Sequence, residues 1–221
     1  MGEAYPCPLC GAAAVFSIQL PVRPVYACPQ CDLKFVPEPW QVTLERERAR
    51  YELHRNRLED EGYVRFLQPV VTCLVRQLRA GGAANPSPPF ARILDFGSGP
   101  TPVLVELLRR EGFESWAYDP FFAPGTDLSQ PFDAVVSTET FEHFRRPRAE
   151  LDRIAGLLRP GGLLVVMSAL WQPGQDFRTW SYANDETHIA FYSVATFRFI
   201  ASTWGLRIIE TNGKDLAAFS K

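Results

Sequence analysis

ILDFGSGPTP, residues 93–102, is a run of apolar strand-forming residues that stops at an acid and then opens into a glycine-rich turn. The residues that follow, VLVELLRREG at 103–112, have the apolar spacing of a helix that glycine ends. A strand, a glycine-rich turn and a helix in this order often hold part of a nucleotide. This stretch therefore predicts an α/β fold with a nucleotide-type site at the turn.

Segments of strand and helix character alternate from this stretch to the end of the chain. Short apolar runs predict strands at residues 91–96, 114–119, 132–138, 163–168, 206–210 and 216–220. Apolar residues three and four positions apart predict helices at residues 102–111, 148–158 and 194–204. This alternation predicts a largely parallel sheet with helices on both faces and a ligand crevice at the carboxyl ends of the strands.

The glycine-rich turn differs from the two common phosphate-binding turns. A dinucleotide fingerprint needs a third glycine, but Pro100, Thr101 and Pro102 follow Gly97-Ser98-Gly99, and no Gly-Lys-Ser/Thr is present for a Walker loop. Asp95 stands two residues before the first glycine, which suits a ligand with a cationic amino group better than a pyrophosphate. Asp119 ends the next strand 20 residues after Gly99, where a carboxylate can bind ribose hydroxyls.

LDFGSG, YDP, FDAVVSTETFEHF and LLRPGGLLVVMS, in this order, resemble class I S-adenosylmethionine (SAM)-dependent methyltransferases over roughly residues 90–221. The resemblance implies a Rossmann-like sheet with SAM as the cofactor. It assigns the methionine end of SAM to the turn, the ribose to Asp119, and the region near the sulfonium to residues 138–140. The cofactor-binding set it implies is Asp95, Gly97, Ser98, Gly99, Asp119, Pro120, Asp127, Thr138, Glu139 and Thr140. Gly99 as a plain turn residue and Glu139 as an ordinary acid at a helix start are the alternatives.

The chain departs from the family pattern after Asp119. The family normally places a helix and a third strand there, but 13 residues separate Asp119 from Asp133. We therefore expect an abbreviated wall around the adenine. Asp127 is the candidate acid for the adenine amino group, and Phe121 or Phe122 is the candidate ring to stack on the base.

Four of the five cysteines form two CxxC pairs near the N-terminus. Cys7 and Cys10 precede Cys28 and Cys31 with 17 residues between the pairs, which is a zinc-ribbon spacing. Four thiolates would complete a tetrahedron and leave no open position, so a structural Zn²⁺ is expected and disulfides are the alternative. Short strands are expected in VFSIQL and PVRPVYAC between the pairs.

The remaining composition sets the domain organisation and the compartment. We predict a zinc ribbon at residues 1–40, a helical segment at 41–80 with Gly62 as a break, a linker at 81–89 and the methyltransferase domain at 90–221. A chain without a secretion signal or a membrane span predicts a cytoplasmic protein. A net charge of −2 without a basic block makes nucleic acid an unfavoured partner, although a local patch is compatible with it.

Three histidines are candidates for acid–base chemistry. His188 follows the fifth strand in a polar, aromatic segment and is the leading candidate for a general base, with Asp185 to orient it. His143 follows the fourth strand and is either a second catalytic residue or a structural one. His54 and Asn56 are candidates to cap the site. Aromatic residues of the same segment form either a substrate pocket or packing: Trp171, Trp180, Tyr182 and Phe191.

The arrangement as a whole looks like a group of bacterial zinc-ribbon methyltransferases. It implies methyl transfer from SAM to a small or carrier-linked metabolite, at oxygen, nitrogen or carbon. Two alternatives stay open. One is an RNA base methyltransferase whose zinc ribbon contacts RNA, and the other is a non-catalytic scaffold or sensor that binds SAM.

Overall fold

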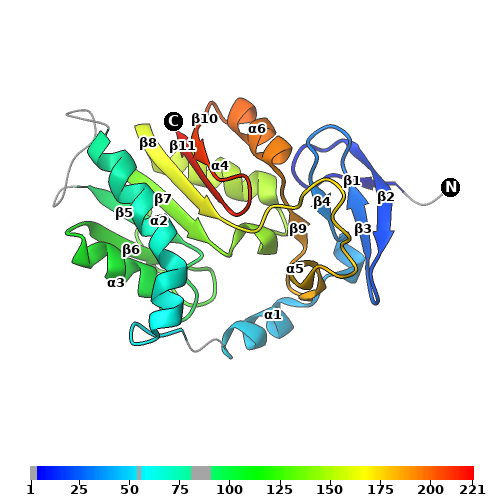
Figure 1. Cartoon of the computed structure of the whole chain (residues 1–221), viewed down its shortest axis with the longest axis horizontal. Coiled ribbons are helices and arrows are strands. Elements are labelled where there is room, and N and C mark those ends of the chain that lie inside the picture. Colours follow the sequence, from blue (N-terminus) through cyan, green and yellow to red (C-terminus); the bar gives the residue numbers. More distant parts are fainter. Residues whose placement is uncertain (1–3, 54–55, 81–90) are drawn as a thin grey trace.

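The structure, a computed structural model, describes residues 4–53, 56–80 and 91–221 and contains two β-sheets (Figure 1). The larger sheet belongs to the C-terminal part of the chain, and the smaller one lies at the N-terminal end. The predicted linker at 81–89 and His54 fall outside the described residues. No helix in the described part of the chain has the length and apolar character that crossing a membrane requires.

The larger sheet has the strand order β10-β11-β8-β7-β5-β6. Its strands are β5 (Arg92–Phe96), β6 (Glu114–Tyr118), β7 (Phe132–Thr138), β8 (Leu158–Met167), β10 (Arg207–Thr211) and β11 (Leu216–Ser220). Strands β6, β5, β7 and β8 are parallel, and β11 runs antiparallel to both β8 and β10. The sheet confirms the predicted α/β fold class.

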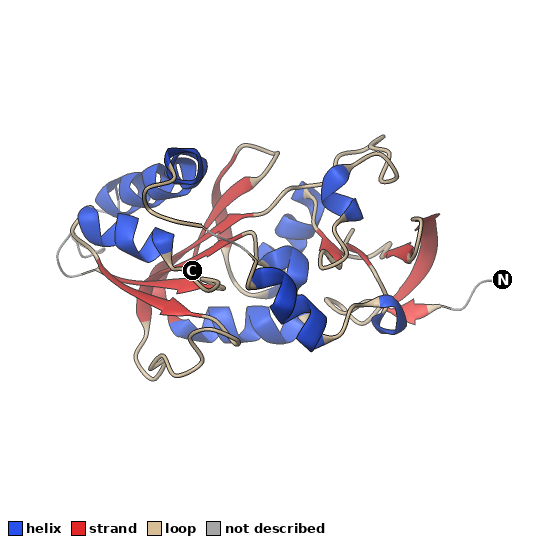
Figure 2. Cartoon of the chain, turned by 90° about the horizontal axis from the view of Figure 1, so that it is seen from below, coloured by secondary structure: helices blue, strands red, loops and turns tan. Residues whose placement is uncertain are grey.

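Helices cover both faces of this sheet (Figure 2). Helices α2 (Glu61–Ala80) and α3 (Val103–Arg110) pack on one face, and α4 (Pro147–Leu157) and α6 (Val194–Thr203) on the other. The strand side chains alternate accordingly: Val136 contributes to the first core and Val135 to the second. A strand buried on both faces is therefore a nearly continuous apolar run, as in FDAVVST.

Within the described residues the sheet ends at β6. The chain leaves β6 through a tight turn closed by an isolated bridge between Asp119 and Ala123, and returns directly to β7. The 13-residue interval contains no strand and no helix, as its length predicted.

The smaller sheet contains a strand from a distant part of the sequence. Its order is β1-β2-β3-β4-β9, with β1 (Tyr5–Pro6), β2 (Ala13–Gln19), β3 (Pro24–Ala27), β4 (Lys34–Phe35) and β9 (Ala190–Phe191). Strands β2 and β3 confirm the two expected between the cysteine pairs. Strand β9 lies after β8 and pairs antiparallel with β4. We call the β1–β4 part, residues 4–36, the ribbon, and residues 168–193 between β8 and α6 the lid.

The packing crosses the predicted domain limits. Leu9 and Leu33 of the ribbon share one buried cluster with Phe141 and Tyr192 from the C-terminal part. Helix α2, which we assigned to a separate helical segment, packs on the larger sheet against β8 and β11. The ribbon and the α/β part therefore form one continuous core, and the predicted limits stay predictions as far as separate folding is concerned.

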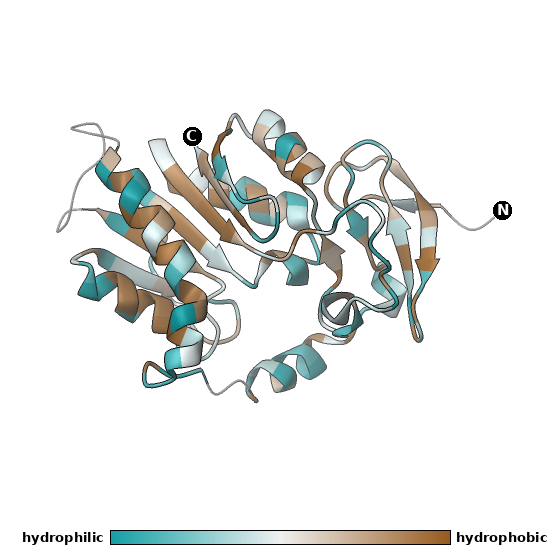
Figure 3. Cartoon of the chain, viewed as in Figure 1, coloured by the Kyte–Doolittle hydropathy of each residue, from teal (hydrophilic) through white to brown (hydrophobic). Residues whose placement is uncertain are grey.

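The segment predicted as helical at 41–80 forms two helices of different character. Helix α1 (Leu44–Tyr51) is capped by Thr43 and is largely hydrophilic in Figure 3, whereas α2 is amphipathic. The break lies before Glu61 rather than at Gly62, because the Asp60 carboxylate accepts the Gly62 and Tyr63 backbone N–H groups and so caps α2.

Candidate functional site

A cavity of about 1080 Å³ lies at the carboxyl ends of β5, β6 and β7. Helices α1 and α2 and the lid residues Asp185, Thr187 and His188 also line it. Its volume is at the upper end of the range for small-molecule sites, so it can hold two ligands side by side. It brings together nine of the ten predicted cofactor-binding residues: Asp95, Gly97, Ser98, Gly99, Asp119, Pro120, Thr138, Glu139 and Thr140.

Asp127 is the predicted cofactor residue that the structure places elsewhere. Its side chain is exposed, accepts the Ser129 backbone N–H at 2.9 Å, and does not line the cavity. The turn between β6 and β7 carries Phe121, not Asp127, into the lining. The adenine-binding role that we expected for Asp127 therefore has no support in its position.

The glycine-rich turn requires glycine at position 97. Gly97 has φ +89°, in the left-handed region, and a Cβ built there would lie 2.2 Å from Thr140 Cγ2. The Thr140 hydroxyl in turn donates a hydrogen bond to the Gly97 carbonyl at 3.2 Å. Gly99 has φ +65° with no atom within 4 Å of its Cβ position, so its missing side chain leaves open space. The two glycines therefore leave the backbone of the turn after β5 accessible to a ligand in the cavity.

Asp95 lies under this turn with an unsatisfied carboxylate. The residue is 2% exposed, and Oδ1 is buried without a hydrogen-bond partner among the described residues. Burial, and then the nearby Asp119 carboxylate, raise the pKa of Asp95 to about 7. A buried, unpaired carboxylate oxygen is costly, so the position suits a ligand that brings a cationic donor.

Asp119 is held in a fixed orientation at the end of β6. Its Oδ2 accepts the Gly99 backbone N–H at 3.0 Å, and its Oδ1 accepts the N–H groups of Phe121 and Phe122 at 2.8 and 3.1 Å. Because a carboxylate has about four acceptor sites, capacity remains for two hydroxyl donors. The geometry therefore suits a vicinal diol such as that of a ribose.

Two histidines face each other at the other end of the cavity. His143 lies in the short helix η3 (Phe141–His143) and His188 in the lid, with ring centroids 4.8 Å apart. His143 Nδ1 lies 2.9 Å from the Thr187 carbonyl and His188 Nδ1 lies 2.8 Å from the Tyr182 carbonyl. A carbonyl oxygen can only accept, so each neutral ring carries its proton on Nδ1 and a lone pair on Nε2.

Asp185 lines the cavity but does not orient the His188 ring as we expected. Its carboxylate accepts the Thr187 backbone N–H at 3.0 Å and the Thr187 hydroxyl at 2.7 Å, and it forms an ion pair with Arg50. The Tyr182 carbonyl is the group that orients His188. Burial lowers the pKa of His188, so the ring is neutral near pH 7.

Two glutamates lie beside the histidines. Glu139 lines the cavity in a left-handed conformation, with φ +48°, which is uncommon for a residue other than glycine. Burial, and then the negative charge of Glu142, raise the pKa of Glu139. Glu142 is 0% exposed, and its Oε2 accepts the Ser168 hydroxyl at 2.9 Å. A strained acid next to a fully buried one is typical of functional sites rather than of helix starts.

Helix α1 closes the cavity through residues that sequence reasoning missed. Arg145, next to η3, forms an ion pair with buried Glu47 at 2.7 Å and also donates to the Val42 carbonyl. Tyr51 donates to Glu47 at 2.8 Å and meets the His143 ring edge-on at 5.2 Å. The sequence did contain a signal for this role, because Tyr51 is an aromatic residue in the otherwise strongly charged helix α1.

The aromatic residues of the lid form packing rather than the wall of the cavity. Trp171, Trp180, Tyr182 and Phe191 belong to a small cluster around Phe177 that includes ribbon residues, and none of the four lines the cavity. The aromatic lining comes instead from residues of α1, α2 and the strand ends: Tyr51, Tyr63, Phe66, Phe96, Tyr118, Phe121 and Phe144.

A buried arginine attaches the lid to the ribbon. Arg23, in the β2–β3 turn, is 3% exposed and donates to the Glu186 carbonyl at 2.6 Å and the Ala183 carbonyl at 2.9 Å, as well as to the Asp185 carbonyl. These carbonyls come just before His188. The ribbon therefore fixes the backbone that presents His188 to the cavity.

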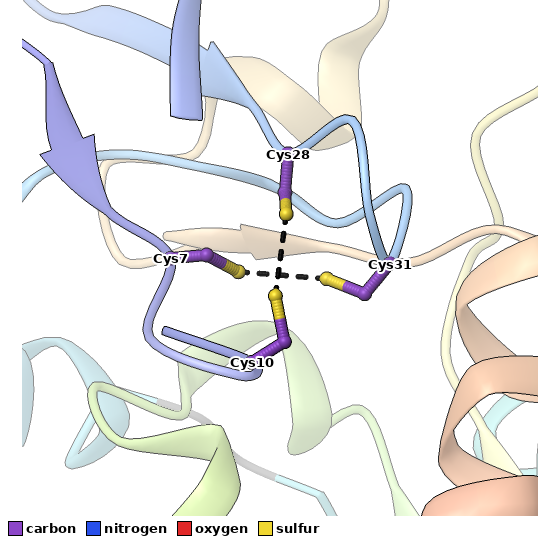
Figure 4. Close-up of side chains that lie close together, drawn as sticks. All are labelled: Cys7, Cys10, Cys28 and Cys31. Carbon is purple, nitrogen blue, oxygen red and sulfur yellow. Dashed lines mark hydrogen bonds between the residues drawn. The ribbon is translucent and has the colours of Figure 1, made fainter. Parts of the chain in front are cut away.

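The four paired cysteines converge on one point (Figure 4). Cys7 and Cys31 Sγ lie 3.5 Å apart, Cys10 and Cys28 Sγ lie 3.3 Å apart, and all four sulfurs are within 4.8 Å of one another. A disulfide would need about 2.05 Å. Thiolates around one tetrahedral Zn²⁺ are separated by roughly 3.8 Å, from a Zn–S bond of about 2.3 Å. The donor set and geometry therefore fit Zn²⁺.

Comparison with known proteins identifies the family of the chain and the fold that it shares with solved structures. The family described as "Methyltransferase domain" matches residues 58–211. An O-methyltransferase family protein from Burkholderia thailandensis is similar in structure, with a TM-score of 0.55 and 14% identity over 82% of this chain. A protein provisionally assigned as a sarcosine dimethylglycine methyltransferase from Galdieria sulphuraria gives a TM-score of 0.52 and 13% identity, covering 76% of this chain and 91% of its own.

These similarities are distant ones. The chain spans 63% of the Burkholderia structure's length, and no curated protein sequence matches it. At such identities the solved structures establish the fold, and the chemistry has to be argued from the residues of the cavity.

Proposed function

Because the chain belongs to the methyltransferase domain family, we propose that it transfers a methyl group from SAM to a small or carrier-linked acceptor held in the same cavity. The observation that carries the proposal is the unpaired, buried Asp95 carboxylate beneath a glycine turn that Thr140 keeps free of side chains. When bound, SAM would supply a methyl carbon bonded to a sulfonium, and a suitably placed nucleophile would bond to that carbon while the carbon–sulfur bond breaks and the neutral thioether leaves.

The cofactor half of the cavity is assigned to the ends of β5, β6 and β7. Asp95 Oδ1 pairs with the amino group of the methionine end, and the bare backbone of Gly97, Ser98 and Gly99 allows close approach. Asp119, with Pro120 beside it, accepts the ribose hydroxyls with the acceptor sites that its backbone donors leave free. Residues 138–140 lie between this half and the histidines.

The acceptor half is assigned to η3, the lid and α1. An acceptor that carries a proton of high pKa needs a base, and a neutral imidazole with a free Nε2 can take that proton. His188, oriented by the Tyr182 carbonyl, and His143, oriented by the Thr187 carbonyl, are these bases. Asp185 acts through Thr187, whose backbone it holds. Closure by α1 removes water from around the reacting atoms.

The ribbon is assigned a structural Zn²⁺ bound by Cys7, Cys10, Cys28 and Cys31. The sulfur cluster that supports this assignment is nearly closed to solvent. Four thiolates leave no position for a substrate, so the ion contributes folding free energy rather than chemistry. Through Arg23 and the β4–β9 pairing, this contribution extends to the lid.

We expect SAM affinity to fall about tenfold between pH 8 and pH 6. An acid with a pKa of about 7 is mostly ionised at pH 8 and about nine-tenths protonated at pH 6, and the cationic ligand needs the ionised form. At pH 6, SAM binding must therefore be accompanied by loss of the proton from the Asp95 carboxyl group. Calorimetry across this range measures the change, and Asp95→Asn should bind weakly with little pH dependence. An affinity in wild type that does not vary with pH would contradict the role of Asp95.

The function itself is tested by transfer of a labelled methyl group from SAM into fractionated cell extract. We expect label in the small-molecule or carrier fraction with wild type and none with Asp119→Ala. Label confined to RNA would overturn the acceptor class, and SAM binding without transfer to any fraction would indicate a sensor or scaffold.

A further inference from the structure

Glu142, His143 and His188 form a compact cluster at the acceptor end of the cavity. One potential ligand atom from each residue lies within 4.8 Å of those of the other two. The backbone fixes the arrangement, because the Ile189 N–H donates to the Glu142 carbonyl at 2.8 Å and so joins the lid to η3. Two imidazoles and one carboxylate are a common ligand set for divalent transition metals.

Both histidines have the surroundings of metal ligands. A metal-binding histidine nearly always donates its second ring N–H to a carbonyl or carboxylate, which fixes the tautomer and the ring orientation. The Thr187 and Tyr182 carbonyls accept from Nδ1 of His143 and His188 at 2.9 and 2.8 Å. The Nε2 lone pairs of both rings are thus left for another partner.

Glu142 supplies a carboxylate with one oxygen that lacks a hydrogen-bond partner among the described residues. The side chain is 0% exposed, and Oε1 has no hydrogen-bond partner among the described residues, while Oε2 accepts the Ser168 hydroxyl. Tyr182 Oη lies 3.1 Å from the same hydroxyl, so the bonded half of the carboxylate is held in place. A buried carboxylate oxygen without a hydrogen-bond partner is costly in the absence of a cation, and the ligand atoms of two imidazole rings lie within 4.8 Å of this carboxylate.

We propose that Glu142, His143 and His188 bind a divalent transition-metal ion of the Zn²⁺, Fe²⁺ or Mn²⁺ type. Ligand atoms around one tetrahedral ion with bonds of about 2.1 Å lie roughly 3.4 Å apart, so separations of up to 4.8 Å need to shrink by at most about 1.4 Å. Both histidines line the cavity, so the open coordination positions face the acceptor half.

If the protein is a methyltransferase as proposed above, the metal site also limits which methyl acceptors can bind. An ion at this place binds an acceptor through oxygen and lowers the pKa of that hydroxyl. A lone pair that holds the ion cannot also take a proton, so with the ion bound the two imidazoles are ligands rather than the bases assigned to the metal-free site, and the acceptor hydroxyl loses its proton to water as it binds the ion. The methyl acceptors that fit this site best carry a hydroxyl group next to a second oxygen atom, so that both oxygens can bind the ion.

Titration of the purified full chain with Co²⁺ tests the site. We expect one equivalent to bind with visible ligand-field bands and without the near-ultraviolet charge transfer of a thiolate ligand, which would indicate the ribbon instead. Glu142→Gln and His188→Gln should each weaken this equivalent at least 100-fold. The matched control is Glu186→Gln, since Glu186 is an exposed lid acid paired with Arg46, and it should bind Co²⁺ like wild type.

A second measurement needs no variant. Bound Co²⁺ should protect His143 and His188 of the wild type from chemical acylation, as located by peptide mass spectrometry. Absence of a saturable equivalent, unchanged binding in both ligand variants, or acylation of both histidines despite Co²⁺ would each overturn the proposal. SAM calorimetry on the same samples separates this failure from failure of the proposed function, because the cofactor residues lie outside the cluster.

Discussion

Gly97→Ala should weaken SAM binding at least about 100-fold and should also lower the stability of the folded protein. The new Cβ would lie 2.2 Å from Thr140 Cγ2 and would hold an unfavourable φ of +89°. Strain of this kind costs about 1–3 kcal/mol, and overpacking costs a similar amount. The turn and Thr140 must move apart, and both line the cofactor half of the cavity. Calorimetry with SAM, together with thermal unfolding, measures the two effects.

Gly125→Ala is the matched control for this prediction. Gly125 lies in the β6–β7 connection, no atom is within 4 Å of its Cβ position, and its φ is outside the left-handed region. The control should bind SAM like wild type. If Gly97→Ala bound SAM within about threefold of wild type, the turn would not be the cofactor cradle.

Cys28→Ser should abolish zinc binding and methyl transfer while leaving part of the SAM affinity. Structural zinc contributes about 10–16 kcal/mol in small zinc domains, which matches or exceeds the whole stability of many domains. Loss of the ion should therefore unfold the ribbon and release Arg23 and β9 from their places against the lid. The turn at the end of β5 does not depend on these contacts. Metal analysis, calorimetry and a transfer assay measure the three outcomes.

Cys73→Ser is the matched control, because Cys73 is equally buried but lies in α2, far from the paired cysteines in the sequence. It should keep one zinc per chain and lose at most a few kcal/mol of stability. A Cys28→Ser protein that kept full transfer activity would show that the lid functions without the zinc-bound ribbon, which would contradict the prediction.

The elements of the larger sheet could be predicted because each carries a local signal. Strands buried on both faces, such as FDAVVST, are apolar runs, and the turn at Gly97 and Gly99 follows one of them directly. The missing third strand followed from counting residues between Asp119 and Asp133. The predicted cofactor residues that line the cavity lie at or just after the ends of the strands, so predicting the strands also placed most of the cavity.

Apart from Tyr51, an aromatic residue in the strongly charged helix α1, the features that sequence reasoning missed have no local signal. Strand β9 is two residues long, so no alternation of side chains can announce it, and its pairing depends on the global position of β4. Arg23 and Glu47 are buried, whereas residues of their types are usually exposed. Glu142 becomes notable through its missing hydrogen-bond partner, which requires knowledge of everything around it.

The β4–β9 pairing sets a condition on the order in which the protein folds. Phe191, the partner of Lys34, leaves the ribosome 157 residues later (191 − 34). The nascent N-terminal sheet must therefore persist with an unpaired edge until Phe191 has been synthesised, a state that exposes it to wrong partners. Early binding of the metal by the four cysteines would stabilise the ribbon while the edge of β4 is still unpaired. The supply of zinc during translation should therefore govern the yield of folded protein.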